Sequence, residues 1–284
     1  MKTFARLAAL LLAFAAAPSF AAITCNVTVT SISTVYSPTV ATDNVSTGSY
    51  TISCTRLATD ANSLAWSLAA NNGLHSGGGN NRVQSAAGNR YSYDLYIDAS
   101  LTNKWQGGTR FTGTLSFGAS LSASVTGPFY VDVFGGQTPA QPAATYTDTV
   151  TVTLRNTANN NTLDTSPFTV TVITTNECQL STPPADIIFT YTSFQPALAT
   201  ANTSFSVRCT TALPYTMALD SAPGTGTIAS LNLSYTLALS QASGTGNGLP
   251  QPYTINGTMA AGQAGKCATA TCSGSQARTL TVTY

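Results

Sequence analysis

The clearest alternating pattern in the chain lies at residues 167–175 (PFTVTVITT) and predicts a β-strand. Phe168, Val170 and Val172 alternate with threonines and an isoleucine. This is the period-two pattern of a strand with one buried face. We expect this strand to complete the sandwich formed by the first half of the chain, with these three side chains in its core.

A second alternating pattern occurs twice. Residues 149–154 (TVTVTL) come just before the strand described above, and residues 279–284 (TLTVTY) repeat them almost letter for letter. The first copy is followed by another predicted strand, whereas the second copy stands at the end of the sequence. We therefore expect two similar domains, 22–176 and 177–284, the first closed by its own last strand and the second lacking that strand.

Further alternating runs predict strands in both halves, such as residues 91–98 (YSYDLYID) and 233–239 (LSYTLAL). The Gly- and Asn-rich residues 71–82 and the Trp105-Gln-Gly-Gly sequence predict connections between strands. Residues 118–127 are small and Ser-rich and are expected to connect to a strand that begins at residue 128. No stretch predicts a helix longer than one turn, so the expected fold class is all-β with two sandwich domains.

Residues 1–21 are predicted to be a secretory signal peptide. Lys2 and Arg6 precede an apolar run at residues 7–17 that is too short to span a bilayer, and residues 19–21 (SFA) provide a small-x-small cleavage site. We expect the mature chain to begin at the next residue and to be exported. No second apolar run of about 18 residues follows, so no transmembrane anchor is predicted.

Composition supports a folded β protein and argues against two kinds of partner. Charged residues are only 7% of the chain, but 12 Tyr, 11 Phe and many threonines are typical of strands rather than of disorder. Without the two basic residues of the signal peptide, 9 of the 11 Lys and Arg remain against 10 Asp and Glu. This balance near zero argues against electrostatic attraction to nucleic acid or to an anionic membrane.

The six cysteines predict three disulfides. An even number in an exported chain favours disulfides, and the single histidine and the lack of a close Cys-x-x-Cys pair count against a metal site. The first two cysteines are separated by nearly as many residues as the next two, and each pair opens one half of the chain. We expect the pairs Cys25–Cys54, Cys178–Cys209 and Cys267–Cys272, the last of which closes a small local loop.

These features together resemble the spore coat protein U-like domain, which is found in subunits of archaic chaperone-usher pili. The resemblance is carried by a cysteine at the head of each domain with a second in a later strand, the YxYxLYxD-type strand at residues 91–98, the Trp-x-Gly-Gly turn at Trp105, and the closing YxDTVTVT at residues 146–153. It covers nearly all of the mature chain, once per half. The second half departs from the pattern, because it lacks the tryptophan turn and has Gln276 and Arg278 in place of Tyr146 and Asp148.

The resemblance implies an incomplete immunoglobulin-like sandwich whose groove is filled first by a periplasmic chaperone and then by the N-terminal extension of an adjacent pilin subunit. Such a donor strand satisfies the unpaired backbone groups of the edge and buries alternate side chains. By analogy, Thr279, Leu280, Val282 and Tyr284 form the edge that pairs with the donor, and basic chaperone residues bind the C-terminal carboxylate. The implied partners are this chaperone, an outer-membrane usher and the adjacent pilin.

The N-terminus bears on the position in the fibre. A shaft subunit needs about ten to fifteen alternating residues ahead of its first cysteine to fill a groove at about 3.3 Å per residue. After the expected cleavage, only Ala22, Ile23 and Thr24 precede Cys25. The resemblance therefore predicts a two-domain tip adhesin that passes through the periplasm to the pilus tip at the cell surface and acts in attachment and biofilm formation.

Adhesion is expected on loops at one end of the first sandwich. The loops at residues 35–40, 74–79 and 121–129 have apolar or Gly-rich tips, and exposed apolar groups mark interaction surfaces because they are unfavourable in water. The candidate residues are Tyr36, Val40, Leu74, Val125 and Phe129. The alternative is that the aromatic and valine side chains pack back onto the ends of the sandwich. The sequence does not define the surface or host ligand.

Catalysis is not predicted, and neither a cofactor nor a metal is expected. His75 is the only histidine and lies in a Gly-rich loop without an evident partner for general-base chemistry. Asp94, Asp98, Asp132 and Asp148 are expected to face solvent or to form turn hydrogen bonds rather than an acid–base pair.

Two other functions remain open. A structural spore-coat or pilus-shaft subunit has the same fold but needs a donor extension, unless the true cleavage site lies elsewhere. A free secreted carbohydrate-binding protein or hydrolase needs two closed domains and a cluster of acidic or aromatic residues. The many aromatic residues keep a sugar-binding role open for the first domain.

Overall fold

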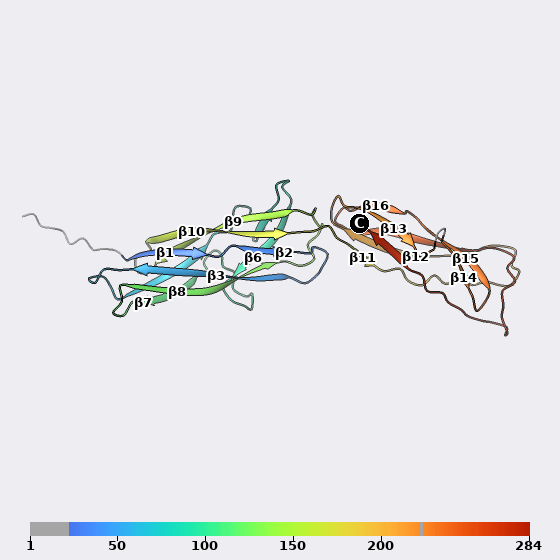
Figure 1. The fold of residues 1–284 in the computed structure, drawn as a ribbon, viewed down its shortest axis with the longest axis horizontal. Helices are drawn as coiled ribbons and strands as arrows, with labels where there is room; N and C mark the ends of the chain where they lie inside the picture. Colours follow the sequence, from blue (N-terminus) through green and yellow to red (C-terminus); the bar gives the residue numbers. More distant parts are fainter. Residues whose placement is uncertain (1–22, 222–223) are drawn as a thin grey trace, which may run out of the picture.

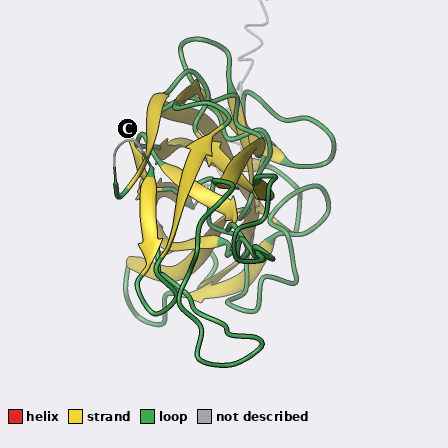
Figure 2. Ribbon diagram, turned by 90° about the vertical axis from the view of Figure 1, so that its right-hand side faces the viewer, coloured by secondary structure: helices red, strands yellow, loops and turns green. Residues whose placement is uncertain are grey.

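The computed structural model describes residues 23–221 and 224–284, so the predicted signal peptide lies outside the described residues. Within these two ranges every regular element is a β-strand, and no helix occurs. The strands form two immunoglobulin-like sandwiches arranged end to end, residues 23–176 and 177–284 (Figure 1). We call them the N-terminal and C-terminal domains. Viewed along the long axis, strands surround the centre and loops project outwards (Figure 2). The all-β fold class is confirmed.

Ten strands build the N-terminal domain. They are β1 (Thr24–Val29), β2 (Ile32–Val35), β3 (Asn44–Thr55), β4 (Ser63–Ala70), β5 (Asn81–Gln84), β6 (Arg90–Tyr96), β7 (Phe111–Ser116), β8 (Ser122–Val133), β9 (Thr145–Asn156) and β10 (Thr162–Ile173). The hydrogen-bonded order is β1-β3-β8-β6-β5-β9-β10-β2, and β4 lies between β7 and β9. β10 is antiparallel to β9 and parallel to β2.

β10 closes the N-terminal domain. It pairs with β9 on one side, where Phe168 lies opposite Val150, and with β2 on the other. Phe168, Val170 and Val172 are buried, in agreement with the alternation of the sequence. β9 pairs along the length of β10 and β2 pairs with its last four residues, so the backbone groups at this end of β10 are satisfied on both sides while its apolar face covers the core.

Aromatic side chains fill the centre of the N-terminal domain. Trp105, from the predicted Trp-x-Gly-Gly turn, is fully buried and donates its indole N–H to the Leu68 carbonyl at 3.0 Å. Its ring packs against Phe111, Phe129 and Phe168 at centroid separations of 5.0, 5.5 and 6.4 Å. Since the N–H has a partner, the large ring stabilises the core without leaving an unpaired polar group.

One long segment differs from its prediction. Residues 118–127 are expected to be a connection, but β8 already begins at Ser122 and pairs with β3. The Tyr50 ring of β3 lies over Gly127, where a Cβ atom would be only 2.5 Å from the Tyr50 hydroxyl oxygen. The small residues of this segment therefore belong to a strand that lies under a large neighbour, and not to a loop.

Eight strands build the C-terminal domain. They are β11 (Cys178–Thr182), β12 (Ala199–Cys209), β13 (Pro214–Leu219), β14 (Thr225–Ile228), β15 (Leu233–Leu239), β16 (Ser243–Thr245), β17 (Gln251–Met259) and β18 (Leu280–Thr283). Their orders are β11-β12-β17-β15-β14 and β16-β13-β18. The N-terminal domain contains the same two orders, as β1-β3-β8-β6-β5 and β7-β4-β9. The two domains are therefore an internal repeat.

The C-terminal domain has no counterpart of β10 or β2 among its described residues. We align the domains on the second cysteine of each, Cys54 in β3 and Cys209 in β12. Residues 187–190 then correspond to β2. In the N-terminal domain β2 is a strand through its pairing with β10 alone. Its counterpart therefore has nothing to pair with, which explains why it is not a strand.

The cysteines form the three pairs that their spacing suggests. The disulfide Cys25–Cys54 links β1 to β3, and Cys178–Cys209 links β11 to β12 at directly opposite positions. The third disulfide, Cys267–Cys272, closes a small loop between β17 and β18. The first two disulfides thus fasten the same two strands in each domain.

Candidate functional site

β18 forms an open edge of the C-terminal domain. One side pairs antiparallel with β13, where Val282 lies opposite Met217. The other side has no strand partner within the part of the chain that the structure describes. In the N-terminal domain the equivalent side of β9 is paired with β10. An unpaired edge presents a row of backbone N–H and C=O groups, which favours the addition of another strand.

The side chains along β18 are only partly covered. Leu280 and Val282 are half-buried, and Tyr284 is 58% exposed. The matching apolar residues of β9 are fully buried; they are Val150, Val152 and Leu154. The same alternation of apolar residues therefore gives a closed core in one domain and a partly exposed apolar face in the other.

Residues 187–191 include the counterpart of β2, the strand that lies on the far side of β10 in the N-terminal domain. Ile187, Phe189 and Tyr191 pack against the C-terminal core, while Ile188 between them is strongly exposed. In the N-terminal domain β10 lies between β9 and β2, so the equivalent space lies between β18 and residues 187–191. We call this space the strand-accepting groove, because a strand placed there can pair with both walls.

Arg278 holds the start of the open edge. It stands where the N-terminal domain has Asp148, so the charge at this position is reversed. Arg278 donates from Nε to Asp220 at 2.7 Å and from Nη1 to the Tyr235 hydroxyl at 3.2 Å. The Thr279 backbone N–H also donates to the Asp220 carboxylate, at 3.1 Å. Hydrogen bonding to Arg278 lowers the pKa of Asp220. The edge therefore begins at a fixed position.

Two of the five predicted adhesive residues lie in the core, so the prediction is wrong for them. Tyr36 is buried, and its hydroxyl donates to the Phe134 carbonyl at 2.7 Å. Phe129 is buried, and its ring fills the space over Gly48, where a Cβ atom would lie 2.3 Å from the ring. Both rings gain burial without an unpaired polar atom, which agrees with the alternative that they pack onto the sandwich.

Two more candidates are poorly placed for adhesion. Val125 lies within β8, half-buried against the core, so the predicted loop at this position is also wrong. Val40 is exposed, but its carbonyl accepts the Gly136 N–H at the end of the domain that faces the C-terminal domain. Val40 thus lies at the joint between the domains, and Val125 lies in a strand and not on a loop.

Leu74 is the candidate that does lie on an exposed loop, and it is 70% exposed. Its backbone N–H donates to Asp148 Oδ1 at 2.8 Å, and the Tyr93 hydroxyl donates to Oδ2 at 2.8 Å. Burial raises the pKa of Asp148, and these hydrogen bonds and nearby His75 oppose that rise. Asp148 is thus a buried anchor for the loop and not a solvent-facing residue, which corrects the prediction.

Two further loops expose leucines at the end of the N-terminal domain that points away from the C-terminal domain, where β3 ends (Figure 1). Leu57 and Leu121 are each more than half exposed. Arg56 is buried and holds both loops: its backbone N–H donates to the Leu121 carbonyl at 2.9 Å and its side chain to Asp60 and Ser120 carbonyls at 3.0 and 3.1 Å. Leu121 begins the predicted adhesive loop at residues 121–129, but neither leucine is among the predicted contact residues, because a single leucine among polar turn residues gives little signal.

Asp94 and Asp132 are buried opposite each other in β6 and β8, which corrects the expectation that they face solvent. Lys104 forms an ion pair with Asp94. Burial, together with Asp43 and Asp94, raises the pKa of Asp132 to about 6. Asp98 does form the expected turn hydrogen bonds, for example with the Asn103 N–H at 2.8 Å. The acids therefore have structural surroundings and do not meet in a catalytic cleft.

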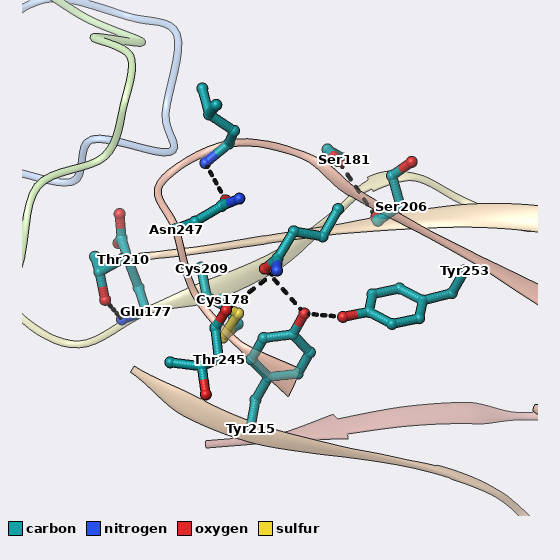
Figure 3. The surroundings of a disulfide bond; sticks show 12 residues. Glu177, Cys178, Ser181, Ser206, Cys209, Thr210, Tyr215, Thr245, Asn247 and Tyr253 are labelled. Atoms are coloured by element: carbon teal, nitrogen blue, oxygen red, sulfur yellow. Dashed lines mark hydrogen bonds between the residues drawn. A yellow bond between two sulfur atoms is a disulfide. The ribbon is translucent and has the colours of Figure 1, made fainter. Parts of the chain in front are cut away.

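The joint between the domains is held by hydrogen bonds. Glu177 lies beside the β11–β12 disulfide (Figure 3) and accepts hydrogen bonds from the Ser37 hydroxyl at 2.7 Å and the Thr39 N–H at 3.0 Å. Arg208 donates from Nη2 to the Gln137 carbonyl at 2.7 Å. Charge-assisted hydrogen bonds of this kind are stronger than neutral ones. The two facing ends of the N-terminal and C-terminal domains are thus joined by hydrogen bonds.

Residues 23–221 and 224–284 contain no group of three or more His, Cys, Asp or Glu side chains placed to hold a metal ion. In these ranges we also find no helix with the length and apolar character needed to cross a membrane. Shallow depressions lie beside β2 and β3 and beside Tyr284. Neither gathers groups suited to catalysis.

The fold and the open edge define a two-domain immunoglobulin-like sandwich protein in which one domain is closed and the other is not. The model of the Spore Coat Protein U domain family matches residues 11–153, half of the chain, and the chain belongs to this family. The matched region ends within β9. The protein is not an enzyme.

Several solved structures are similar in fold. A chain of the CsuC–CsuE chaperone-tip adhesion subunit pre-assembly complex from archaic chaperone-usher Csu pili of Acinetobacter baumannii is 15% identical, covers 92% of this chain and 100% of that chain, and has a TM-score of 0.49. The CupB6 tip adhesin from Pseudomonas aeruginosa is 11% identical, with coverages of 93% and 94% and a TM-score of 0.37. Self-complemented MyfA, the major subunit of Myf fimbriae from Yersinia enterocolitica, is 11% identical, with coverages of 52% and 98% and a TM-score of 0.28. No curated protein matches the chain.

Proposed function

We propose that this protein is the tip adhesin subunit of an archaic chaperone-usher pilus and that it mediates attachment and biofilm formation. The observation that carries the proposal is the unpaired edge of β18, in a domain whose strand order otherwise matches that of a complete one. A donor strand from another chain fills the strand-accepting groove, pairs with β18 and buries alternate apolar side chains there. Membership of the Spore Coat Protein U domain family supports the same assignment.

The donor changes during export. In the periplasm a chaperone supplies the strand. At the outer-membrane usher the N-terminal extension of the adjacent pilin replaces the chaperone strand, and the subunit moves to the cell surface. The chaperone is needed because an exposed apolar edge otherwise pairs with other copies and aggregates.

The closed N-terminal domain supports a position at the tip. β10 already occupies the place that a donor strand takes in the C-terminal domain, and β1 is fully used in pairing with β3. Among the described residues, the position that β10 fills in the N-terminal domain is empty beside β18 in the C-terminal domain. A subunit that accepts a strand at one end and presents a closed domain at the other suits the end of a fibre.

Adhesion is assigned to the free end and side of the N-terminal domain. Leu57 and Leu121 are exposed on loops that the buried Arg56 holds together, and Leu74 is exposed on the loop anchored by Asp148. Exposed apolar side chains on fixed loops favour contact with an apolar surface. Without the two basic residues of the predicted signal peptide, 9 Lys and Arg stand against 10 Asp and Glu, a balance that offers little ionic attraction.

The test is a full-length variant that carries its own donor strand. Residues 155–173 comprise the last two residues of β9, the turn that follows, and β10. They are appended directly after Tyr284, the counterpart of Leu154. The appended strand can then follow β18 as β10 follows β9. We expect this variant to be monomeric without a chaperone and to protect the β18 amides from hydrogen exchange. We expect the natural chain to aggregate or to be degraded unless its chaperone is co-expressed.

The matched control carries the same extension with the copies of Phe168, Val170 and Val172 replaced by Asp. We expect it to behave like the natural chain, since charged side chains cannot fill the apolar groove. A natural chain that is monomeric and cooperatively folded in both domains without a chaperone contradicts strand acceptance. Antibody labelling along whole fibres, and not at their ends, contradicts the tip position and indicates a shaft subunit.

A further inference from the structure

The base of the C-terminal domain, the end that faces away from the N-terminal domain, is built like the base of the N-terminal domain. In the N-terminal domain residues 37–40 form a turn, and the Val40 carbonyl accepts the Gly136 N–H at 2.7 Å. In the C-terminal domain residues 192–195 form the matching turn, and the Gln195 carbonyl accepts the Gly262 N–H at 2.9 Å. Each turn is thus hydrogen-bonded to the loop that precedes β9 or its counterpart β18.

A tyrosine and a glutamine hold the two bases in the same way. The Tyr36 hydroxyl accepts the Gln137 N–H at 3.5 Å, and the Tyr191 hydroxyl accepts the Gln263 N–H at 2.8 Å. The side-chain amide of each glutamine bonds to the backbone of the equivalent strand, β6 or β15. The two bases are therefore equivalent in structure and not only in strand order.

The base of the N-terminal domain is a docking surface in this structure. Thr39 donates its N–H to Glu177, and its carbonyl accepts a hydrogen bond from Gln179 at 3.1 Å. The Gln137 carbonyl accepts from Arg208. Only residues 174–177 separate β10 from β11. The base of the N-terminal domain thus contacts the facing end of the C-terminal domain. A short link connects β10, the strand that completes the N-terminal domain, to β11.

The residue at the equivalent docking position of the C-terminal domain is an exposed aromatic. Thr39 and Phe194 each lie 15 residues before the second cysteine of their domain. Phe194 is 70% exposed and has a φ of 60°, in the left-handed region that bulky residues rarely adopt. Its N–H donates to the Gln263 carbonyl at 2.9 Å, which fixes this conformation. Leu198, at the end of the same loop, is also more than half exposed.

We propose that the base of the C-terminal domain is a second contact surface for the adjacent pilin, in addition to the strand-accepting groove. The inference rests on the proposed function. A donor strand that runs as β10 does leaves the groove at this base, so a link as short as residues 174–177 brings the top of the next sandwich against Phe194. Because Phe194 stands where Thr39 binds Glu177, the partner surface is apolar and lies close to the first cysteine of the pilin.

A rigid, exposed aromatic is suited to such a contact. A side chain that is already held in its bound conformation loses little conformational freedom on binding, and aromatic anchors carry much of the binding energy in protein interfaces. Strand insertion alone connects two subunits through a flexible link. Contact at Phe194 restricts the angle between them, as the Glu177 and Arg208 hydrogen bonds do between the two domains of this chain.

The test places a photo-crosslinking benzoylphenylalanine at position 194 of the full chain, in fibres assembled with its own chaperone, usher and pilins. The control carries the same group at position 74, because Leu74 is also 70% exposed. We expect position 194, and not position 74, to crosslink to residues next to the first cysteine of the adjacent pilin. Mass spectrometry of the crosslinked peptides identifies the site.

The outcomes separate this inference from the proposed function. If the chain is absent from the fibres, both fail. If it is present with a detergent-resistant joint, but position 194 crosslinks no more than position 74 or crosslinks to a second copy of this chain, only the inference is overturned. We also expect the double substitution Phe194→Ser and Leu198→Ser to speed heat release of the chain from fibres by about tenfold, while Leu74→Ser leaves it unchanged. An unchanged rate in the double variant overturns the inference.

Discussion

The N-terminal and C-terminal domains share the order of eight strands and an equivalent disulfide, which joins β1 to β3 in one domain and β11 to β12 in the other. Only the N-terminal domain has a complete core. The apolar face of β9 is fully buried because β10 and β2 complete the sandwich around it. The equivalent face of β18 is partly exposed. An alternating sequence therefore defines which side chains point inwards, but a neighbouring strand decides whether they are covered.

The two domains also differ where these strands begin. In the N-terminal domain Tyr93 donates to Asp148, and the same carboxylate holds the Leu74 loop. In the C-terminal domain Tyr235 accepts from Arg278, which pairs with Asp220. The position that anchors a candidate adhesive loop in one domain thus anchors the start of the open edge in the other. A charge reversal at one position accompanies the change of role.

The largest effect is expected from opening the closed domain. Val170→Asp places a charge in the fully buried face of β10, and an unpaired buried charge costs at least about 4 kcal/mol. We expect the N-terminal domain to lose its stable fold and to become sensitive to proteases, as we expect for the C-terminal domain without a chaperone. Limited proteolysis and hydrogen exchange of the full chain measure this.

The control for this prediction is Thr171→Asp, on the other face of the same strand. Thr171 is half-buried, so its charge can reach water. We expect it to change the stability of the domain by less than about 1 kcal/mol. Equal damage from both substitutions contradicts the view that covering the β9 face is what closes the domain.

The fold was largely predictable from the sequence, for physical reasons that particular residues illustrate. Phe168, Val170 and Val172 alternate strictly, and strict alternation arises from a sheet with one buried face, so the strand and its inward face follow directly. Where the alternation is weak, as around Gly127, the strand was missed. There the neighbouring Tyr50 ring covers the glycine, and a sequence does not show which ring lies over which glycine.

The candidate site was less predictable. Tyr36 and Phe129 are predicted on loops with apolar or Gly-rich tips, but both rings turn into the core. Phe194 gave no signal at all. Its importance depends on its equivalence to Thr39 and on a left-handed backbone conformation, and both require the fold. Long-range equivalence between domains becomes visible only when their strands are superimposed in order.

The next largest effect is expected from the disulfides. The separations of 29 and 31 residues in Cys25–Cys54 and Cys178–Cys209 are nearly equal, so each disulfide stabilises its domain by about 3 to 4 kcal/mol in the chain-entropy account. We expect the C-terminal domain to unfold first on reduction, because it lacks the cover of a strand like β10. Hydrogen exchange of the full chain during titration with dithiothreitol reports each domain. If both domains unfold at the same dithiothreitol concentration, the expected difference in their stability is contradicted.

A smaller effect is expected at the joint. Glu177→Ala removes the acceptor of the Ser37 and Thr39 hydrogen bonds and is expected to weaken the contact between the domains by about 2 kcal/mol. Small-angle X-ray scattering of the full chain in complex with its chaperone is expected to show a broader range of particle lengths. Asp186→Ala, which removes an exposed carboxylate of the same domain, serves as the control. An unchanged profile for Glu177→Ala contradicts a joint fixed by these bonds.

The smallest expected effect is a pH dependence of stability that the N-terminal domain has and the C-terminal domain lacks. Burial raises the pKa of Asp132 to about 6 in the folded N-terminal domain, above the value of about 4 for an unfolded chain. The folded state therefore binds this proton more tightly, so its stability increases as pH falls from about 6 to about 4 and is lower at neutral pH. The counterpart of the Asp94–Asp132 pair in the C-terminal domain is Thr236 opposite Thr258, which does not titrate.

Asp132→Asn tests this difference. We expect it to stabilise the N-terminal domain at pH 7 by about 1 kcal/mol, because a neutral amide avoids the cost of a buried charge next to Asp94 and Asp43. It is also expected to flatten the pH dependence between about pH 4 and about pH 6, while amides of the C-terminal domain remain unaffected. Hydrogen exchange at several pH values, with the intrinsic exchange rate corrected at each, resolves the two domains in one sample. If the variant keeps the pH dependence of the natural chain, Asp94 is the group that titrates, and its ion pair with Lys104 is then too weak to hold it charged.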